Sequence, residues 1–293
     1  MRYVIFHFVV CQEIAFCGGR YMTRYLIRNL VLASIISFIG LKQPVWAADA
    51  NCGPFNVAMY ELGSLFYFDE AKGYLGIDKD IIEAVASRTG CEFKPFLDSR
   101  VRIWTYLADG TLDMSVSGIP NPEREQFARF IIYFQARNYL LVRPELAKRL
   151  NSLDAFFLDP KLRLAVVKSF KHGKNFDQWI DDLRAQGRVD EYPDIDAVAR
   201  IFRLGRVDGL LSMPVVWSSV IKRNQLEGKV SFLDFAPDDR IPHGLILSRK
   251  RIPKEAAERM RQAVSAMQED GTLEKIFNRY LPADIVKRMM PSQ

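Results

Sequence analysis

Residues 107–125 read LADGTLDMSVSGIPNPERE, and this stretch decides the fold class. Gly110 ends a helical pattern, because glycine readily adopts the left-handed conformation that closes helices. The strand-like run LDMSVS (112–117) follows, and then a polar turn with two prolines. Upstream, the strand-like runs FNVAMY (55–60) and EFKPF (92–96) are each followed by a helical pattern. This order predicts parallel strands joined by helical crossovers.

The same alternation returns in the second half of the chain. Strand-like runs at 163–167 and 208–212 alternate with helical patterns around FDQWIDDL and DAVARIF. Further strands are expected at 230–235 and 244–248, and two amphipathic helices close the chain. The sequence therefore predicts an α/β fold with two lobes joined by crossing strands and a ligand cleft between the lobes.

Charge and composition exclude several classes of protein. With 49% hydrophobic and 26% charged residues, the chain can bury a sizeable core, which argues against a disordered or fibrous protein. The formal charge is +6, but residues 1–47 hold five Lys and Arg residues and one acid, which leaves 36 basic against 34 acidic residues. This nearly neutral remainder has no Lys/Arg run and argues against nucleic-acid binding.

The first 47 residues have the pattern of a leader. From Met22 they read a basic MTRYLIRN, an apolar LVLASIISFIGL, and KQPVWA, in which Val45 and Ala47 occupy the positions that a signal peptidase reads. About a dozen apolar residues are too few for a membrane-spanning helix of ~20 residues, so a retained anchor is the weaker interpretation. We expect an exported, periplasmic protein that starts at Met22 and is cleaved before Ala48.

Two cysteines remain after the leader, Cys52 and Cys91. Each stands just before a strand-like run, so the two thiols lie side by side if those strands are parallel neighbours. In an oxidising compartment this favours a disulfide, and two free buried thiols are the alternative.

Three blocks of sequence carry a family resemblance. They are GYLGIDKDII (73–82), in which Asp78 is a candidate helix N-cap, the run from Leu107 to Glu125, and EDGTLEKIFNRYL (269–281). Together they resemble the bacterial extracellular solute-binding proteins of family 3, the polar amino acid type that serves ABC importers.

The resemblance implies a type II periplasmic-binding-protein-like fold. One lobe would comprise 48–135 plus 243–293 and the other 136–242, and a solute would bind between the lobes and close them about the hinge. The implied partners are a small-molecule solute and the inner-membrane permease of an importer. No cofactor is implied, and we expect a monomer.

In the first lobe, Arg124 lies where the family places an arginine that clamps the solute's carboxylate. The turn is one residue shorter than the family pattern, and a solvated surface arginine is the alternative. Ser117, Gly118 and Ile119 match strand-end residues whose backbone groups meet the ligand, although Ser117 could equally be a structural turn serine. Pro120 follows where the family often has Thr or Ser, so Asn121 is the candidate substitute.

Other candidate ligand-binding positions depart further from the family. Ser169 stands in a loop that is bulkier and more cationic than the family's, which either favours an acidic solute or is simply a solvated charged loop. Met213, with Ser212 beside it, replaces an aspartate that pairs with the ammonium group of amino acids. Tyr60 stands near a position that often holds an acid, and neighbouring Glu61 could substitute. The carboxylate-binding half is thus partly kept and the ammonium-binding half is not, which predicts a small carboxylate or an amino acid as solute.

Two rival functions stay open. A dehydratase-like enzyme on this fold would need a positioned acid in the second lobe, where Met213 stands, so we expect no catalytic residue. A solute sensor or accessory subunit would use the same lobe closure as a transport protein. His172 and His243 are isolated, so we expect no metal site.

Overall fold

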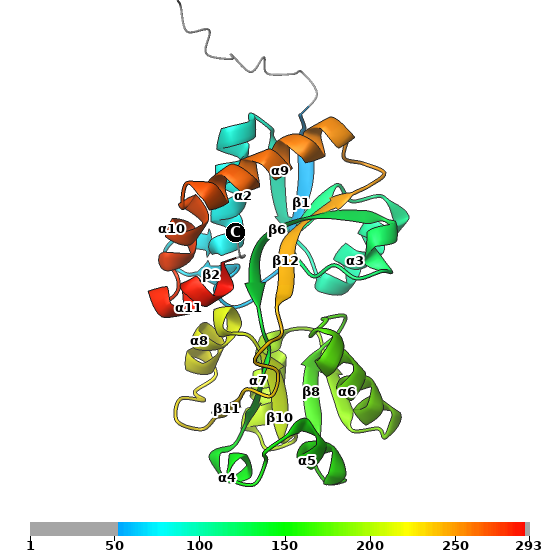
Figure 1. The fold of residues 1–293 in the computed structure, drawn as a ribbon, viewed down its shortest axis with the longest axis vertical. Helices are drawn as coiled ribbons and strands as arrows, with labels where there is room; N and C mark the ends of the chain where they lie inside the picture. Colours follow the sequence, from blue (N-terminus) through cyan, green and yellow to red (C-terminus); the bar gives the residue numbers. More distant parts are fainter. Residues whose placement is uncertain (1–51, 291–293) are drawn as a thin grey trace, which may run out of the picture. The chain divides into compact units, whose positions relative to one another are not determined.

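The computed structural model describes residues 52–290, and the predicted leader lies outside the described residues. Within this range, two five-stranded sheets and one short hairpin form, and helices cover both sheets (Figure 1). We call the first sheet with its helices lobe 1 and the second sheet with its helices lobe 2. The predicted mixed α/β class is confirmed.

The sheet of lobe 1 has the strand order β4-β1-β5-β12-β6. Its strands are β1 (Phe55–Met59), β4 (Phe93–Leu97), β5 (Met114–Gly118), β12 (Ile241–Ser248) and β6 (Ala128–Ala136). β1 runs parallel to β4 and β5, whereas β12 runs antiparallel to β5 and β6. The predicted parallel strands with helical crossovers are confirmed, because α2 and α3 make the two connections.

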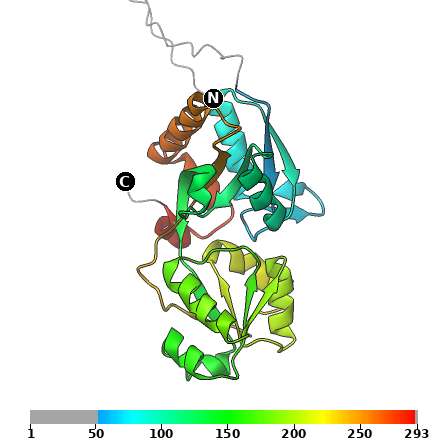
Figure 2. The ribbon, with the colours of Figure 1, turned by 90° about the vertical axis from the view of Figure 1, so that its right-hand side faces the viewer.

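Helices cover both faces of this sheet (Figure 2). They are α2 (Ile77–Thr89), α3 (Arg100–Asp109), α9 (Lys254–Glu269), α10 (Thr272–Asn278) and α11 (Ala283–Met289), and the hairpin β2 (Tyr67–Asp69) with β3 (Gly73–Leu75) precedes α2. Gly90 and Gly110 end α2 and α3 in the left-handed conformation, with φ of 71° and 75°. The stop at Gly110 is the predicted one.

Asp78 does not cap α2, contrary to the sequence interpretation. The helix begins at Ile77 after Gly76, and Asp78 is a buried residue of its first turn. Its carboxylate accepts hydrogen bonds from side chains across the lobe instead of from the helix's own backbone. The sequence pattern of a small acid before an apolar run cannot distinguish an aspartate that caps the helix from one that bonds to distant side chains.

The sheet of lobe 2 has the order β11-β7-β10-β8-β9. Its strands are β11 (Ser231–Leu233), β7 (Tyr139–Val142), β10 (Gly209–Ser212), β8 (Leu164–Val167) and β9 (Val189–Tyr192). β8 is parallel to both neighbours, whereas β7 is antiparallel to β10 and β11. The helices are α4 (Pro144–Ala147), α5 (Leu153–Leu158), α6 (Lys174–Ala185), α7 (Ile195–Arg203) and α8 (Pro214–Arg223).

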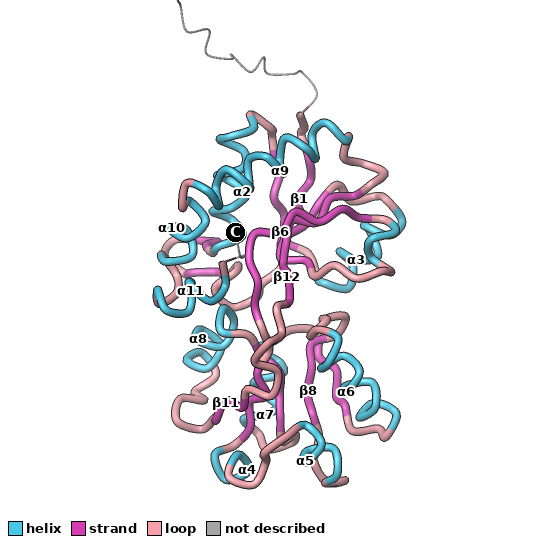
Figure 3. The backbone as a smooth tube through the Cα atoms, in the orientation of Figure 1, coloured by secondary structure: helices cyan, strands magenta, loops and turns pink. Residues whose placement is uncertain are grey.

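Two segments of chain connect the sheets (Figure 3). The first runs from the end of β6 at Ala136 to the start of β7 at Tyr139, and the second from Leu233 to Ile241. β6 and β12 pair over the whole length of β12, from Ile241 opposite Ala136 to Ser248 opposite Ala128. The two connections therefore leave lobe 1 side by side.

Cys52 and Cys91 form a disulfide, as predicted. The cysteines stand before β1 and β4, which are parallel neighbours with Phe55 opposite Phe93. Backbone hydrogen bonds from Glu92 to Cys52 and from Phe55 to Glu92 hold the two strand starts together. The bridge thus closes the end of the lobe 1 sheet from which these strands begin.

Within residues 52–290 no helix combines the length and the apolar character that a membrane crossing requires.

Candidate functional site

A cavity of about 310 Å³ lies at the carboxyl ends of parallel strands from both lobes. Lobe 1 contributes the segment after β1, the end of β4 and the start of α3, and lobe 2 contributes the loop after β8 and the start of α7. Strand ends and helix starts of this kind form the ligand crevices of open α/β sheets. The lining residues are Tyr60, Glu61, Leu62, Leu97, Asp98, Ser99, Arg100, Arg102, Val167, Phe170, Pro193, Asp194 and Ile195.

Arg100 is the buried charge of this large cavity, with 5% of its surface exposed. Its guanidinium carbon lies 4.6 Å from the ring centre of Tyr60 in lobe 1 and 4.6 Å from that of Phe170 in lobe 2. Among the described residues, its Nε and Nη2 atoms have no hydrogen-bond partner. Two aromatic faces stabilise the cation, but they leave these donors unsatisfied.

A small cavity of about 20 Å³ adjoins the large one and shares Leu62, Val167, Phe170 and Ile195 with it. Three of its lining residues carry buried polar atoms that lack a partner within the described part of the chain. They are Asn138 Oδ1, His172 Nδ1 and Ser212 Oγ. A cavity of this size holds about one water or one small polar group.

Burial keeps His172 neutral near pH 7. Desolvation, with the nearby charge of Arg100, lowers the pKa of His172 to about 3. Its backbone is fixed, because the N–H donates to Asp177 at 2.8 Å and the carbonyl accepts from Asn138 at 3.1 Å. The small cavity is therefore polar but uncharged.

Lobe 1 contains a fully paired polar group beside the cavities. Asp78 accepts hydrogen bonds from Ser117 Oγ at 2.8 Å and from the Tyr133 hydroxyl at 2.6 Å. The Ser117 N–H donates to the Tyr133 hydroxyl oxygen at 2.9 Å, and the Ser117 carbonyl accepts from Tyr60 at 3.3 Å. Burial raises the pKa of Asp78 to about 7, although the two hydroxyl donors oppose that shift.

Arg124 is buried and already bonded. Its Nη1 donates to the Ile119 carbonyl at 2.9 Å and its Nη2 to the Ser169 carbonyl of lobe 2 at 3.0 Å. The guanidinium carbon lies 3.7 Å from the ring centre of Trp104. Burial, followed by the charge of Arg100, lowers the pKa of Arg124 to about 9, so Arg124 stays charged at neutral pH. Its two terminal nitrogens thus join a carbonyl of lobe 1 to a carbonyl of lobe 2.

The other predicted residues at the end of β5 have structural neighbours. A Cβ on Gly118 would lie 2.3 Å from Ile246 Cγ1, so glycine is needed for β5 to pack on β12. Ile119 is buried, and its carbonyl meets Arg124. The Asn121 side chain accepts a hydrogen bond from the Arg124 backbone N–H at 2.8 Å and so holds this turn. Whether these residues contact a solute stays a prediction.

The remaining predicted positions divide between the cavities. Tyr60 and Glu61 line the large cavity, and Ser212 and Met213 line the small one. Ser169 is exposed and adopts a left-handed φ of 61°, and its carbonyl is the one that Arg124 contacts. Their roles in solute binding stay predictions as well.

Sequence reasoning missed Arg100, Asn138 and the buried role of Asp78 in this region. Arg100 follows Ser99, which caps α3 by accepting from the Arg102 N–H. This N-cap signal could have placed Arg100 at the first turn of a helix that starts at a strand end. Asn138 lies in the first crossing segment, where periodic patterns give no information.

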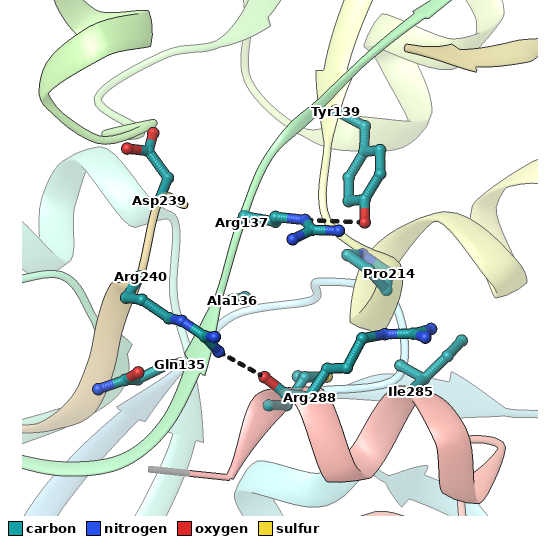
Figure 4. Close-up of a pocket in the computed structure, with 10 residues that line it drawn as sticks. Gln135, Ala136, Arg137, Tyr139, Pro214, Asp239, Arg240, Ile285 and Arg288 are labelled. Atoms are coloured by element: carbon teal, nitrogen blue, oxygen red, sulfur yellow. Dashed lines mark hydrogen bonds between the residues drawn. The ribbon is translucent and has the colours of Figure 1, made fainter. Parts of the chain in front are cut away.

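A separate cavity of about 70 Å³ lies at the crossing segments (Figure 4). Arg137 there donates to the Tyr139 hydroxyl at 2.9 Å and pairs with Asp234 at 2.7 Å. Arg240 donates to the Arg288 carbonyl at 3.5 Å, and the Arg288 side chain pairs with Asp284. The arginines around this cavity thus have partners, in contrast to Nε and Nη2 of Arg100.

The family model described as bacterial extracellular solute-binding proteins, family 3, matches residues 60–283. No curated protein sequence matches the chain. A solved structure of an ancestral arginine-binding protein bound to arginine is 20% identical with a TM-score of 0.66, over 78% of this chain and 98% of that one. These findings confirm the predicted family and the type II periplasmic-binding-protein fold.

Two further solved structures share the fold. A histidine kinase sensor domain with similarity to periplasmic binding proteins is 13% identical with a TM-score of 0.66, over 78% of this chain and 97% of that one. The ancestral amino acid-binding protein AncCDT-1, a precursor of cyclohexadienyl dehydratase, is 20% identical with a TM-score of 0.64, over 78% and 95%. At these identities the likeness extends to the fold alone.

Proposed function

Because the chain belongs to the bacterial extracellular solute-binding proteins of family 3, we propose that it captures a small polar solute between its lobes and delivers it to an ABC importer. Binding would close the lobes about the two crossing segments. We also propose the predicted lobe limits, 48–135 plus 243–293 and 136–242, and a periplasmic location after cleavage of the leader.

One observation carries this proposal: buried polar atoms from both lobes lack partners around two adjoining cavities. Lobe 1 supplies Arg100, lobe 2 supplies His172 and Ser212, and the crossing segment supplies Asn138. An unsatisfied buried polar atom destabilises a protein by about 1–3 kcal/mol, and native proteins retain few of them. A solute that bonded to these atoms would remove that destabilisation and would hold the lobes together.

The side chains around the cavities favour a carboxylate or an amino acid as the solute. The ammonium group of an amino acid needs an acidic partner, yet Met213 is a buried thioether and Asp78 is bonded within lobe 1. Glu61 and Asp194 are exposed acids that line the large cavity, and Asp194 already caps α7, so Glu61 is the candidate to face an ammonium group. Structures of the same fold are described as bound to arginine and as amino acid-binding, which supports including amino acids in the test.

Sensing is the second candidate, because a histidine kinase sensor domain shares this fold. Solute capture would be common to both functions, and the membrane partner would differ. We propose no enzymatic activity, since a dehydratase would need a positioned acid in lobe 2 and the small cavity presents Ser212 and Met213 there.

The test is thermal unfolding of the purified protein against amino acids, di- and tricarboxylates, polyamines and sugars. A solute at 100 times its dissociation constant should add about 2.7 kcal/mol to the free energy of unfolding. A shift with one chemical class supports solute capture. If no compound shifts the transition, the capture proposal is wrong. Reconstituted permease and ATPase, assayed for solute-dependent ATP hydrolysis, would then separate import from sensing.

A further inference from the structure

Arg100 begins α3 at the carboxyl end of β4, and its position in the large cavity is set by both lobes. The rings of Tyr60 and Phe170 hold the guanidinium between them at equal distances of 4.6 Å. Tyr60 follows β1 in lobe 1 and Phe170 follows β8 in lobe 2. The group is thus oriented by two faces and is buried where the lobes meet.

The two unpartnered nitrogens of Arg100 have a defined geometry. Nε and Nη2 occupy one edge of the guanidinium, and their N–H bonds on that edge point in nearly the same direction. This fork matches the two oxygens of a carboxylate and binds them bidentately. Both nitrogens of this edge, which a carboxylate can bind side-on, are therefore buried and without a protein partner among the described residues.

The acids near this fork have other partners or positions. Asp98 pairs with Arg102, and Asp194 caps α7 by accepting from the Ala197 N–H. Asp78 holds Ser117 and Tyr133. None of these carboxylates forms a hydrogen bond with Nε or Nη2 of Arg100. The structure leaves a buried cation that an external anion could neutralise.

We propose that Arg100, and not Arg124, binds the anionic group of the solute, and that this group is a planar carboxylate. This inference rests on the proposed solute capture and names its chemical class. A carboxylate that bonds to both nitrogens lies in the plane of the guanidinium, and a planar group fits this arrangement beside the two rings better than a tetrahedral one. Arg124 then acts as a positioning residue that joins Ile119 to the Ser169 loop.

The experiment measures binding of matched pairs by calorimetry and by thermal unfolding of the purified protein. The probes are succinate with succinamide, glutarate with glutaramide, benzoate with benzamide, and methylphosphonate as a tetrahedral anion. At least one carboxylate should bind, and its amide should not. Arg100→Met should weaken that carboxylate about a hundredfold, the effect typical of losing one partner of a buried charge pair.

Two further variants distinguish solute contact from a structural role. Arg100→Lys keeps a charge at this position and should restore part of the affinity. Arg88→Met is the control. Arg88 is an exposed arginine in the last turn of α2 that pairs with Asp270, so its loss should leave solute binding unchanged. The melting temperature of Arg100→Met without solute should equal or exceed that of the parent, because the substitution removes an unsatisfied buried charge.

Each contrary result has its own meaning. If a carboxylate binds equally well to the parent and to Arg100→Met, or if the amides bind as well as the acids, this inference is wrong and solute capture stands. A lower melting temperature of Arg100→Met without solute, with no rescue by lysine, would assign Arg100 a structural role and overturn the inference. If neither these probes nor the broader panel binds, both proposals fall together.

Discussion

Two groups of buried polar side chains in this protein differ in whether their polar atoms have hydrogen-bond partners. In the paired group, Asp78, Ser117 and Tyr133 bond to one another, and Arg124 bonds to two carbonyls. In the unpaired group, each member keeps a polar atom without a partner among the described residues. Its members are Arg100, Asn138, His172 and Ser212.

This difference in hydrogen bonding indicates that the paired group serves stability and the unpaired group serves solute recognition. A buried polar group that is fully bonded stabilises one arrangement of the chain, whereas a group left unbonded weakens the empty protein and is satisfied only when something binds. Substitutions in the paired group should therefore lower stability. Substitutions in the unpaired group should spare or raise stability and should lower solute affinity.

The largest expected effect concerns Asp78 and pH. Its pKa is 3.8 when unfolded and about 7 when folded, so between these values the folded state keeps a proton that the unfolded state loses. The contribution of Asp78 to stability is complete below pH 3.8 and is lost as pH rises to about 7, by up to about 4 kcal/mol. Asp78→Asn should lack this loss.

Urea unfolding of both proteins at half-unit steps from pH 4 to pH 8 measures the difference. The asparagine amide oxygen can still accept from Ser117 or Tyr133, so the variant should fold. Parallel pH profiles for the two proteins would show that Asp78 is not the titrating group, and the description of the paired group would need revision.

A smaller effect is expected for Arg124, whose terminal nitrogens bond to Ile119 and Ser169. Arg124→Ala should lower the free energy of unfolding by about 2–3 kcal/mol, because the Ile119 and Ser169 carbonyls lose a charged donor. Urea denaturation at pH 7 measures this loss. Arg100→Met under the same conditions is the matched comparison, and a similar loss in both variants would erase the distinction between the two groups.

The smallest effect on stability is expected for Ser212. Its buried hydroxyl has no partner among the described residues, so Ser212→Ala should not lower the free energy of unfolding and should raise it by up to about 1 kcal/mol. Ser115→Ala is the matched control, because the buried Ser115 hydroxyl donates to the Ala58 carbonyl at 2.7 Å. That loss should be about 1 kcal/mol. Equal losses in chemical denaturation would indicate a hidden partner for Ser212.

Sequence patterns predicted the fold well where strands and helices are periodic. β8 and β10, for example, lie within the predicted strand-like runs 163–167 and 208–212, and α3 ends at Gly110 where the helical pattern ends. The short hairpin β2–β3 was not predicted, because three-residue strands are too short for a periodic signal. The helix α11, which follows Pro282, was not predicted.

The candidate site was less predictable than the fold. Tyr60, Glu61, Ser212 and Met213 were expected at the cleft, and they line cavities. The bonding of a side chain depends on neighbours distant in sequence, so the pattern around Arg124 could not reveal that Ser169 supplies one of its acceptors. For the same reason nothing local marked Nε and Nη2 of Arg100 as atoms without a partner.

The contact between Arg124 and Ser169 has an evolutionary consequence, because the acceptor is a backbone carbonyl. The side chain at position 169 can drift while the contact persists, provided that the residue tolerates a φ of 61°, as Gly, Asn and Asp do. A search for positions whose residues covary among homologues would therefore miss this contact between the lobes. Homologues should instead show an arginine at 124 beside a varied set of small residues at 169.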